Sequence, residues 1–385
     1  MRFPEFSGEW NKYTINDLAT VVGGGTPDTT VKSYWGGDIQ WFTPSEIGKN
    51  KYVDFSKRTI TRDGLDNSSA KLLPLHTILL SSRATVGECS IASNECTTNQ
   101  GFQSLIAKQC NIDFLYYLIQ TKKKDLIRNA CGSTFLEISA NEIRKIKVAV
   151  PVQNEQEQIA KLLSLIDERI ATQNKIIEKL QSLIKGLVDE LMTVLLKGKL
   201  YPFSSFYIKA GEGGTPTTSV VEYYTEGTIP FIKIEDLSCK YLTNNKDFIT
   251  ELGMQKSSAW LIPSKSVIYS NGATIGAISI NEYPVCTKQG ILGIVPNTNI
   301  NVEYLYLLMS SSYFSKEIRR IITEGTMKTA YLKDINHIKC PLPSMAQQKN
   351  ITNLTSSIEE KLSIEQELLR FLNLQKQYLL HMIFI

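Results

Sequence analysis

Acidic and histidine side chains are the residues of this sequence whose types could support acid–base or metal chemistry. Asp38 with Glu46, and Glu235 with Asp236, could act as general acid and general base. A chain with 38 acidic residues contains such pairs by chance, so their spacing alone assigns no catalytic role. None of the three histidines stands at metal-ligand spacing from a cysteine, so no metal site is expected.

Motifs for nucleotide and ester chemistry are also missing from the sequence. The glycine-rich segment Gly23–Pro27 lacks the Gly-Lys pair of a phosphate-binding P-loop and is interpreted as a loop entering a domain. Ser81–Arg83 has no GxSxG context, which argues against a hydrolase. The Pro-Pro tetrapeptide of amino-methyltransferases is absent as well. The sequence therefore predicts a chain without a catalytic centre.

The sequence contains an internal repeat. Gly24–Pro27 (GGTP) recurs as Gly213–Pro216, 189 positions later. Further segments match at this offset to within one residue: SSA at 68–70 and 257–259, AT(V/I)G at 84–87 and 273–276, QG at 100–101 and 289–290, and N(I/V)(D/E)(F/Y)LY at 111–116 and 301–306. A repeat of this length indicates a duplicated domain rather than a solenoid unit.

Each copy is predicted to combine strands with a helix. In the first copy, strands are expected near 77–80, 88–92 and 102–107, and a helix over 114–129. Asn111 is a suitable N-cap, and Asp113 stands in the first turn, where the helix dipole favours negative charge. Asn301 and Glu303 occupy the same places in the second copy.

Two long helices are predicted, one after each copy. Between about Glu155 and Lys197, apolar residues step by three, four or seven, with Gln173 at the one skipped position: Ile166, Ile170, Ile177, Leu180, Ile184, Leu187, Leu191 and Val194. This is the seam of a coiled coil, on a helix about 60 Å long. The tail from about Ala346 repeats the pattern with Ile351, Leu354, Ile358, Leu362, Leu368, Leu372 and Leu379.

The expected fold is α+β, with two similar domains of mixed strands and helices. The two long helices are predicted to pair as an antiparallel coiled coil with an internal pseudo-twofold axis. In the alternative arrangement, each helix packs on its own module or on another chain. The predicted domains are residues 1–150, a first helix at 151–198, residues 199–343 and a second helix at 344–385.

The composition constrains the compartment and the partner. No run of eighteen apolar residues exists and the start lacks a secretory signal, so neither a membrane span nor export is expected. Seven cysteines without a CxxC motif favour free thiols in the cytoplasm. A net charge of +4 permits a nucleic-acid partner without indicating one.

The ordered, duplicated motifs resemble the DNA-specificity subunit of type I restriction–modification systems over essentially the whole chain. The segments that carry the resemblance are FPEFSGEW at 3–10, the two GGTP loops, SSRATVG at 81–87 and SNGATIG at 270–276, NQG at 99–101 and KQG at 288–290, Gly132-Ser133-Thr134 and Gly325-Thr326, PVQNEQEQIA at 151–160 and PSMAQQKNI at 343–351. Family members often carry a longer lead before the first segment, so either the natural start is short or the chain is trimmed.

The resemblance implies that each module is a target-recognition domain for one half of a bipartite site in double-stranded DNA. It implies that the helices set the distance between the half-sites and dock two methyltransferase subunits. Those subunits would carry S-adenosylmethionine and methylate adenine, and endonuclease subunits that use ATP would complete a restriction complex. The chain itself is expected to hold no cofactor and to supply specificity without catalysis.

Candidate DNA contacts are expected where the copies differ, because the two half-sites need not be the same. Arg and Lys suit guanine, while Asn and Gln suit adenine. The windows 28–66 and 217–255 contribute Lys49, Lys51, Lys57, Arg58, Arg62, Lys233, Lys240, Asn245 and Lys246. Candidates outside these windows are Arg83, which has Gly272 as its counterpart, and Lys122, Lys123, Lys124, Arg128, Arg319, Arg320 and Lys328. The alternative for each is a solvated surface charge. Gln100 and Gln289 are shared by both copies and are expected to support a loop.

Two other functions remain open at this point. A scaffold could use its modules to bind proteins or glycans and its helices to oligomerise. A self-sufficient DNA-modifying enzyme would transfer methyl groups or cleave DNA by itself. Affinity that falls steeply with salt favours DNA over the scaffold, because each neutralised phosphate releases counterions.

Overall fold

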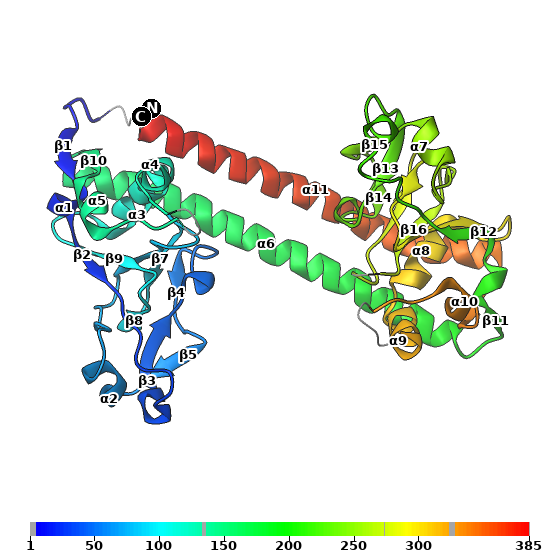
Figure 1. The fold of residues 1–385 in the computed structure, drawn as a ribbon, viewed down its shortest axis with the longest axis horizontal. Helices are drawn as coiled ribbons and strands as arrows, with labels where there is room; N and C mark the ends of the chain where they lie inside the picture. Colours follow the sequence, from blue (N-terminus) through cyan, green and yellow to red (C-terminus); the bar gives the residue numbers. More distant parts are fainter. Residues whose placement is uncertain (1–4, 133–135, 273, 323–327, 385) are drawn as a thin grey trace. The chain divides into compact units, whose positions relative to one another are not determined.

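The computed structural model describes residues 5–132, 136–272, 274–322 and 328–384 (Figure 1). Parts of the family-like segments lie outside the described residues: Phe3, Pro4, Ser133, Thr134, Ala273, Gly325 and Thr326. The chain forms two compact units. Unit 1 comprises Met1–Asn174 with Glu367–Ile385, and unit 2 comprises Lys175–Gln366. We call the globular part of each unit, without the long helices, its module.

Unit 1 is built around a five-stranded main sheet. In sheet order its strands are β2 (Ala19–Gly23), β9 (Gln103–Ala107), β6 (Ile78–Leu80), β7 (Cys89–Ala92) and β4 (Tyr52–Val53). Neighbours are antiparallel except β4, which pairs with β7 in parallel. Ile78 and Leu80 enter one hydrophobic core, while Leu79 between them enters another. The strand is therefore buried on both faces, which explains its wholly apolar sequence.

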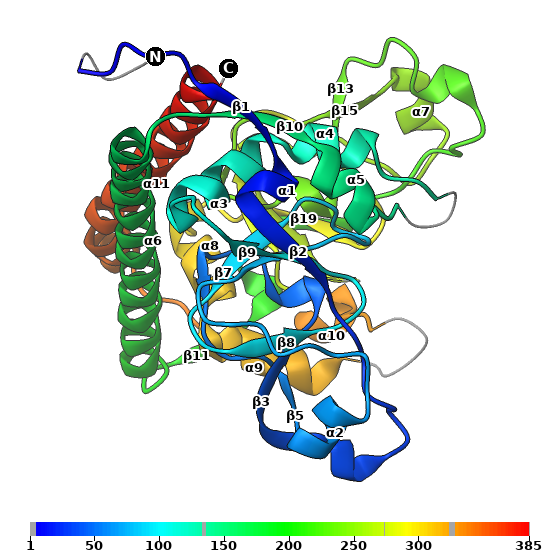
Figure 2. The same ribbon diagram turned by 90° about the vertical axis from the view of Figure 1, so that its left-hand side faces the viewer.

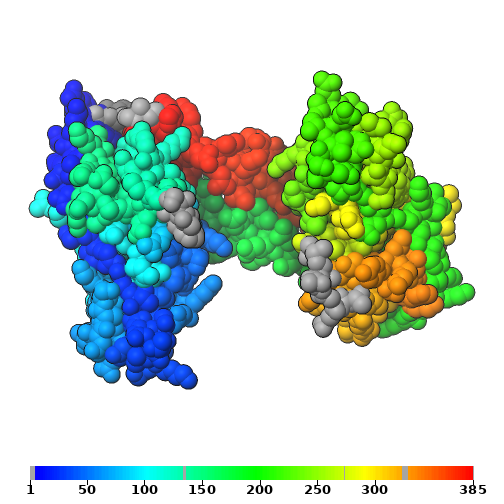
Figure 3. Space-filling view, in the orientation of Figure 1, coloured from blue at the N-terminus to red at the C-terminus, as the bar shows by residue number. Residues whose placement is uncertain are grey.

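A three-stranded sheet forms a separate lobe of unit 1. Its elements are β5 (Arg58–Ile60), β3 (Trp35–Phe42), β8 (Cys96–Thr98) and the short helix α2 (Arg62–Asp66). Trp41, Ile60 and Leu65 form a small core of its own. Both ribbon views place β3, β5 and α2 at the end of unit 1 away from the long helices (Figures 1 and 2), and Figure 3 shows the surface of this end in blue. We call these elements the distal lobe.

Helices cover the face of the main sheet that carries Ile78 and Leu80. The main one is α3 (Ile112–Thr121), and the Asn111 side chain caps it by accepting a 3.0 Å hydrogen bond from the Phe114 amide. The helix predicted over 114–129 is interrupted at Lys122, and α4 (Lys123–Arg128) follows. The remaining elements are β1 (Asn11–Thr14), α1 (Ile15–Leu18), α5 (Ala140–Lys145) and β10 (Lys147–Val150), with β1 and β10 antiparallel.

Unit 2 repeats this architecture strand for strand. Its main sheet has the order β12 (Tyr207–Glu212), β19 (Ile291–Pro296), β16 (Val267–Ser270), β17 (Ile278–Asn281) and β14 (Tyr241–Leu242). Its distal lobe contains β15 (Asp247–Ile249), β13 (Ile229–Ile232), β18 (Cys286–Thr287) and α7 (Glu251–Gln255). The other elements are β11 (Leu200–Pro202), α8 (Val302–Ser310), α9 (Ser312–Ile321), α10 (Leu332–Ile335) and β20 (Lys339–Pro341). The shared strand order confirms the predicted duplication of one α+β module.

The two predicted long helices are α6 (Gln153–Leu195) and α11 (Met345–Ile383). In unit 1, Ile383 near the end of α11 joins the core that contains Ile159 and Leu163 near the start of α6. In unit 2, Ile351 near the start of α11 joins Val188 and Met192 near the end of α6. In both units the start of one long helix therefore packs with the end of the other, which confirms the antiparallel pairing. Each helix also packs on the module that precedes it, so the two alternatives are combined.

Three residues predicted in the coiled-coil seam are exposed, which corrects that part of the prediction. Val194 is 62% exposed, Leu354 53% and Leu368 36%. Val188, Met192 and Thr355 occupy buried positions beside them. A straight helix has 3.6 residues per turn and drifts from a 3.5-residue repeat, so the buried stripe moves by one position towards the helix ends. No helix among the described residues combines the length and apolarity needed to cross a bilayer.

Candidate nucleic-acid interface

Lys51, a candidate base-reading residue, is buried where the main sheet of unit 1 meets the long helix. Its side chain is 10% exposed, and its Nζ lies 2.7 Å from the Asp113 carboxylate on α3. The same ammonium donates a 2.6 Å hydrogen bond to the Ser164 hydroxyl on α6 and lies 4.8 Å from the centre of the Tyr117 ring. An ammonium held by these partners is not available to DNA. We therefore remove Lys51 from the candidate DNA contacts.

Lys240 occupies the equivalent place in unit 2. Its Nζ lies 2.5 Å from Glu303 on α8 and 2.5 Å from Glu359 on α11, and its side chain is 16% exposed. Burial alone would lower the pKa of Lys240, but the hydrogen bonds to Glu303 and Glu359 outweigh it and raise the pKa. Lys240 is thus a charged structural residue and also leaves the candidate set.

A signal in the sequence could have identified this pair. Lys51-Tyr52 and Lys240-Tyr241 stand 189 positions apart, at the offset of the repeat. Both tyrosines donate 2.8 Å hydrogen bonds to the same acids as the lysines, Asp113 and Glu303. A dipeptide shared by both copies suits a shared structural role better than discrimination between two half-sites. The two dipeptides lie inside windows in which the copies otherwise differ, so their correspondence is easily missed.

Arg58 is the best-positioned candidate in the distal lobe of unit 1. Its exposed guanidinium lies over Trp35, 3.6 Å from the ring centre, and 5.4 Å from Trp41. Each indole is fixed by a hydrogen bond from Nε1, to the Asp28 carbonyl at 3.1 Å and to the Gly25 carbonyl at 3.0 Å. Stacking holds the planar guanidinium while its N–H groups remain at the edge, which suits bidentate donation to a guanine or a phosphate. The two tryptophans were not predicted to have this role.

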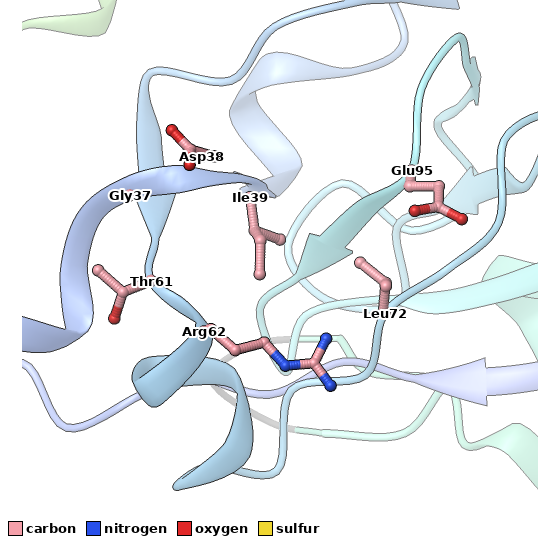
Figure 4. Close-up of a pocket in the computed structure, with 7 residues that line it drawn as sticks. All are labelled: Gly37, Asp38, Ile39, Thr61, Arg62, Leu72 and Glu95. Carbon is pink, nitrogen blue, oxygen red and sulfur yellow. The ribbon is translucent and has the colours of Figure 1, made fainter.

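Two other basic candidates, Lys57 and Arg62, belong to this lobe, whereas Lys49 lies beside β7 of the main sheet, where its neighbours Gly48 and Asn50 bond to Ser90. Lys49 and Lys57 are exposed. Arg62 on α2 forms an exposed ion pair with Asp66 at 3.3 Å. Arg62 also lines an open pocket of about 460 Å³ with Gly37, Asp38, Ile39, Thr61, Leu72 and Glu95 (Figure 4). The two acids of this pocket make it unsuited to a phosphate.

Basic residues of unit 1 outside the distal lobe are mostly neutralised by neighbouring acids. Arg83 donates from Nε and Nη2 to the Glu137 carboxylate, at 3.0 and 2.6 Å. On α4, Lys123 pairs with Glu88 and Arg128 with Asp125. Lys124 is exposed, and Lys122 stands at the break between α3 and α4. Arg83, Lys123 and Arg128 can contact phosphates only if these ion pairs open, so they are weaker candidates than Arg58. Lys122 and Lys124 have no ion-pair partner among the described residues.

In unit 2 the candidates separate into engaged and free side chains. Lys233 forms a 2.9 Å ion pair with Asp247, and this hydrogen bond raises the pKa of Lys233. The Asn245 amide is used on both sides, because Nδ2 donates to the Asp247 carbonyl and Oδ1 accepts from the Tyr283 hydroxyl. Arg320 pairs with Glu317. Lys246, Arg319 and Lys328 are exposed, with no ion-pair partner in the part of the chain that the structure describes.

The distal lobes of the two units differ in charge at one equivalent position. In unit 1, Arg58 of β5 pairs across the sheet with Trp41 of β3. In unit 2, the same pairing joins Asp247 of β15 to Phe231 of β13. An arginine in one copy is therefore replaced by an aspartate in the other, on strands with matched topology. The side chain at this position is therefore a hydrogen-bond donor in unit 1 and an acceptor in unit 2, where Lys233 pairs with it at 2.9 Å.

The loops shared by both copies have a supporting role in unit 1. Gln100 accepts a hydrogen bond from the Thr26 hydroxyl through Oε1, which ties the QG turn to the GGTP loop and confirms the prediction for Gln100. In unit 2 the backbone amide of Gln289 donates to the Thr215 hydroxyl at 3.4 Å.

Among the described residues, no group of three or more histidine, cysteine or acidic side chains is placed to hold a metal ion.

Comparison with known proteins agrees with the duplicated architecture. The family model described as the type I restriction modification DNA specificity domain matches residues 7–182 and 206–373. The MjaIX specificity subunit of Methanocaldococcus jannaschii is 29% identical, with 92% of this chain and 88% of that protein covered. The EcoR124I/EcoR124II specificity subunit of Escherichia coli is 28% identical over 43% of each chain.

Solved structures show the same fold. The S subunit of a type I restriction–modification system from M. genitalium has a TM-score of 0.56 at 19% identity, covering 100% of this chain and 99% of that one. A chain from a structural study of assembly of the type I restriction–modification system has a TM-score of 0.60 at 14% identity, covering 98% of both chains. Two matched specificity domains, one in each unit, cover most of the sequence. The chain therefore belongs to the family of type I restriction–modification DNA specificity subunits, whose members are not themselves enzymes.

Proposed function

We propose that the chain recognises a bipartite site in double-stranded DNA, with each module contacting one half. The observation that supports this most directly is the replacement of Arg58 by Asp247 at matched positions of the two distal lobes. One scaffold with opposite hydrogen-bonding character at the same place is suited to two different half-sites. Arg58, Lys57 and Arg62 of the distal lobe, together with Lys49 beside β7, are the candidate contacts of unit 1. Lys246, Arg319 and Lys328 are the candidate contacts of unit 2.

We further propose that the long helices dock methyltransferase subunits. Within unit 1, the outer face of α11 exposes an apolar stripe at steps of three, three and four residues: Leu368 (36% exposed), Phe371 (52%), Leu374 (48%) and Tyr378 (59%). An exposed apolar stripe that starts beside the coiled-coil seam at Leu368 and runs along the outer face suits a second helix from a partner. Two methyltransferase subunits would bring S-adenosylmethionine, and endonuclease subunits would bring ATP. All seven cysteines are free, which is consistent with a cytoplasmic complex.

Mapping methylated adenines in a host genome with and without this chain tests the proposal. The expected result is a set of adenines within one bipartite sequence with a constant gap, present only when the chain is expressed with its methyltransferase. An Arg58→Ala variant should relax or abolish recognition of one half-site and leave the other unchanged. The matched control is Lys265→Ala, which removes an exposed ion pair with Glu282. A genome without such a motif, or a variant that alters both halves equally, contradicts the proposal.

Salt dependence separates this function from a protein- or glycan-binding scaffold. DNA affinity should fall linearly on a log–log plot against salt concentration, with a slope of about −0.9 for each phosphate contact. A flat response with specific binding to a protein or glycan would favour the scaffold. Methyl transfer or cleavage by the purified chain alone would instead identify a self-sufficient enzyme.

A further inference from the structure

Each module is joined to a long helix by a largely buried lysine at the edge of its main sheet, with the side chain 10% exposed in Lys51 and 16% in Lys240. Lys51 directly precedes β4, the edge strand, and its carbonyl accepts a hydrogen bond from Ile91 of β7 at 2.7 Å. Lys240 directly precedes β14, and its carbonyl accepts the corresponding 2.7 Å bond from Ile280 of β17. The backbone of each lysine is thus part of the sheet, which fixes the origin of its side chain.

Each ammonium has one acidic partner in its own module and another acceptor on a long helix. The module partners are Asp113 of α3 at 2.7 Å and Glu303 of α8 at 2.5 Å. The helix partners are Ser164 of α6 at 2.6 Å and Glu359 of α11 at 2.5 Å. The lysine therefore connects three elements: the sheet edge, the helix that covers the sheet, and the long helix.

A buried glutamine makes a second attachment in each unit. Gln156 of α6 accepts a 3.0 Å hydrogen bond from the Asn111 amide, directly before α3. Gln348 of α11 accepts a 2.8 Å bond from the Asn301 amide, directly before α8. The glutamine holds one end of the covering helix, and the lysine holds the edge of the sheet. Two separated polar attachments restrain rotation of a module about its helix, because hydrogen bonds require a defined direction. Apolar packing alone restrains this rotation less, because the hydrophobic effect is not directional.

Orientation of a module on its helix matters for a protein that reads a bipartite site. Adding one base pair to the gap moves the second half-site by about 3.4 Å and turns it by about 34° around the duplex. A module that rotates freely on its helix accommodates such a change, whereas a fixed module rejects it.

We propose that Lys51 and Lys240 are positioning residues that lock each module on its long helix and so make the gap between half-sites part of recognition. This inference rests on the proposed bipartite DNA recognition. It assigns the two lysines to gap selectivity rather than to base contacts. Their helix-side acceptors, Ser164 and Glu359, share the role, because they are the groups through which the lock reaches the helix.

The test separates the helix-side acceptors from the module-side acceptors. Glu359→Gln and Ser164→Ala weaken the link to the long helix and leave the lysine paired inside its module. The matched controls, Glu303→Gln and Asp113→Asn, weaken the pair inside the module and keep the link to the helix. Each full-length variant is purified with its methyltransferase subunits. Its affinity is then measured by fluorescence anisotropy on duplexes that carry both mapped half-sites with the gap changed by one or two base pairs.

For the wild type, a change of one base pair should lower the affinity by about tenfold or more. In Glu359→Gln and Ser164→Ala the penalty should shrink to about threefold or less, while affinity for the native gap falls only modestly. The two control variants should keep the wild-type gap profile. Ser164→Ala removes one hydroxyl and is expected to fold, so it decides the outcome if Glu359→Gln proves unstable.

The failures of the two proposals are distinguishable. A wild-type complex that binds no bipartite sequence overturns the proposed function itself. A wild type with a sharp gap preference that Ser164→Ala and Glu359→Gln retain overturns the positioning role. Equal broadening in helix-side and module-side variants also overturns it, because loosening of the fold as a whole then accounts for the effect.

Discussion

Gln348 gives the sharpest test of how the long helix is fixed to its module. The side chain is fully buried, and Oε1 accepts a 2.8 Å hydrogen bond from the Asn301 amide. Nε2 donates to the carbonyls of Asn299 at 3.0 Å and Pro343 at 2.9 Å. Gln348→Met preserves the length of the side chain and removes all three hydrogen bonds. One amide and two carbonyls then lose this partner in a site closed to water.

The cost follows from these three groups. A buried polar group that loses its hydrogen-bond partner lowers the stability by about 1–3 kcal/mol. The loss is smallest for a carbonyl oxygen that still accepts another hydrogen bond through its second lone pair. We expect Gln348→Met to lower the free energy of unfolding by about 3–4 kcal/mol, a large part of a typical stability of about 5–15 kcal/mol. The neighbouring Gln347→Met is the control. Gln347 is exposed, and among the described residues its side chain accepts only from Ser344 at the helix start, so its loss should cost about 1 kcal/mol.

Urea unfolding of the full-length chain, followed by circular dichroism, measures the difference. Because the chain has two compact units, hydrogen exchange in peptides covering 299–310 should show where protection is lost. If Gln348→Met and Gln347→Met lie within about 0.5 kcal/mol of each other, the glutamine is not a structural attachment and the reasoning is refuted. Exchange that rises only in unit 1 would refute it too.

Three further predictions concern the lysines at the sheet edges, the cysteines and the long helices. Lys240→Met leaves the partly buried carboxylates of Glu303 and Glu359 without their cation, so it should lower the free energy of unfolding in urea by about 2–3 kcal/mol. Lys51→Met leaves one such carboxylate, Asp113, and should therefore cost less. At pH 8 a thiol reagent should modify exposed Cys131 and Cys239 quickly. Burial raises the pKa of Cys286 to about 11, so this thiol should react only after unfolding. Fast reaction of all seven cysteines would contradict the packing. Deleting one heptad from each long helix removes about 10 Å, so genome methylation should report a gap shorter by about three base pairs, and an unchanged gap would exclude the helices as the ruler.

The fold could be predicted from the sequence to the extent that local patterns recur. Matched turn residues such as Gly24–Pro27 and Gly213–Pro216 identified two modules, and the structure gives both the same strand order. Apolar steps of three and four residues identified both long helices to within a few residues of their ends. The break at Lys122 was missed, because α3 and α4 continue one apolar pattern across it.

The site was harder to predict, because exposure of a lysine depends on residues far away in the sequence. Lys51 forms an ion pair with Asp113 and donates a hydrogen bond to Ser164, and no local pattern connects either residue to it. Arg58 could be named as a candidate, but its support by Trp35 required the register of β3 against β5. Charge by itself did not separate a cation that supports the fold from one that faces solvent.

The joint between module and helix has a consequence for how such chains diversify. The module contributes a lysine and a carboxylate, and the long helix contributes only an acceptor, which is a hydroxyl at Ser164 and a carboxylate at Glu359. A module transplanted from the first position to the second would still find an oxygen for its ammonium. New half-site preferences can therefore be acquired by exchanging whole modules between positions or between related chains, without redesign of the interface that holds them.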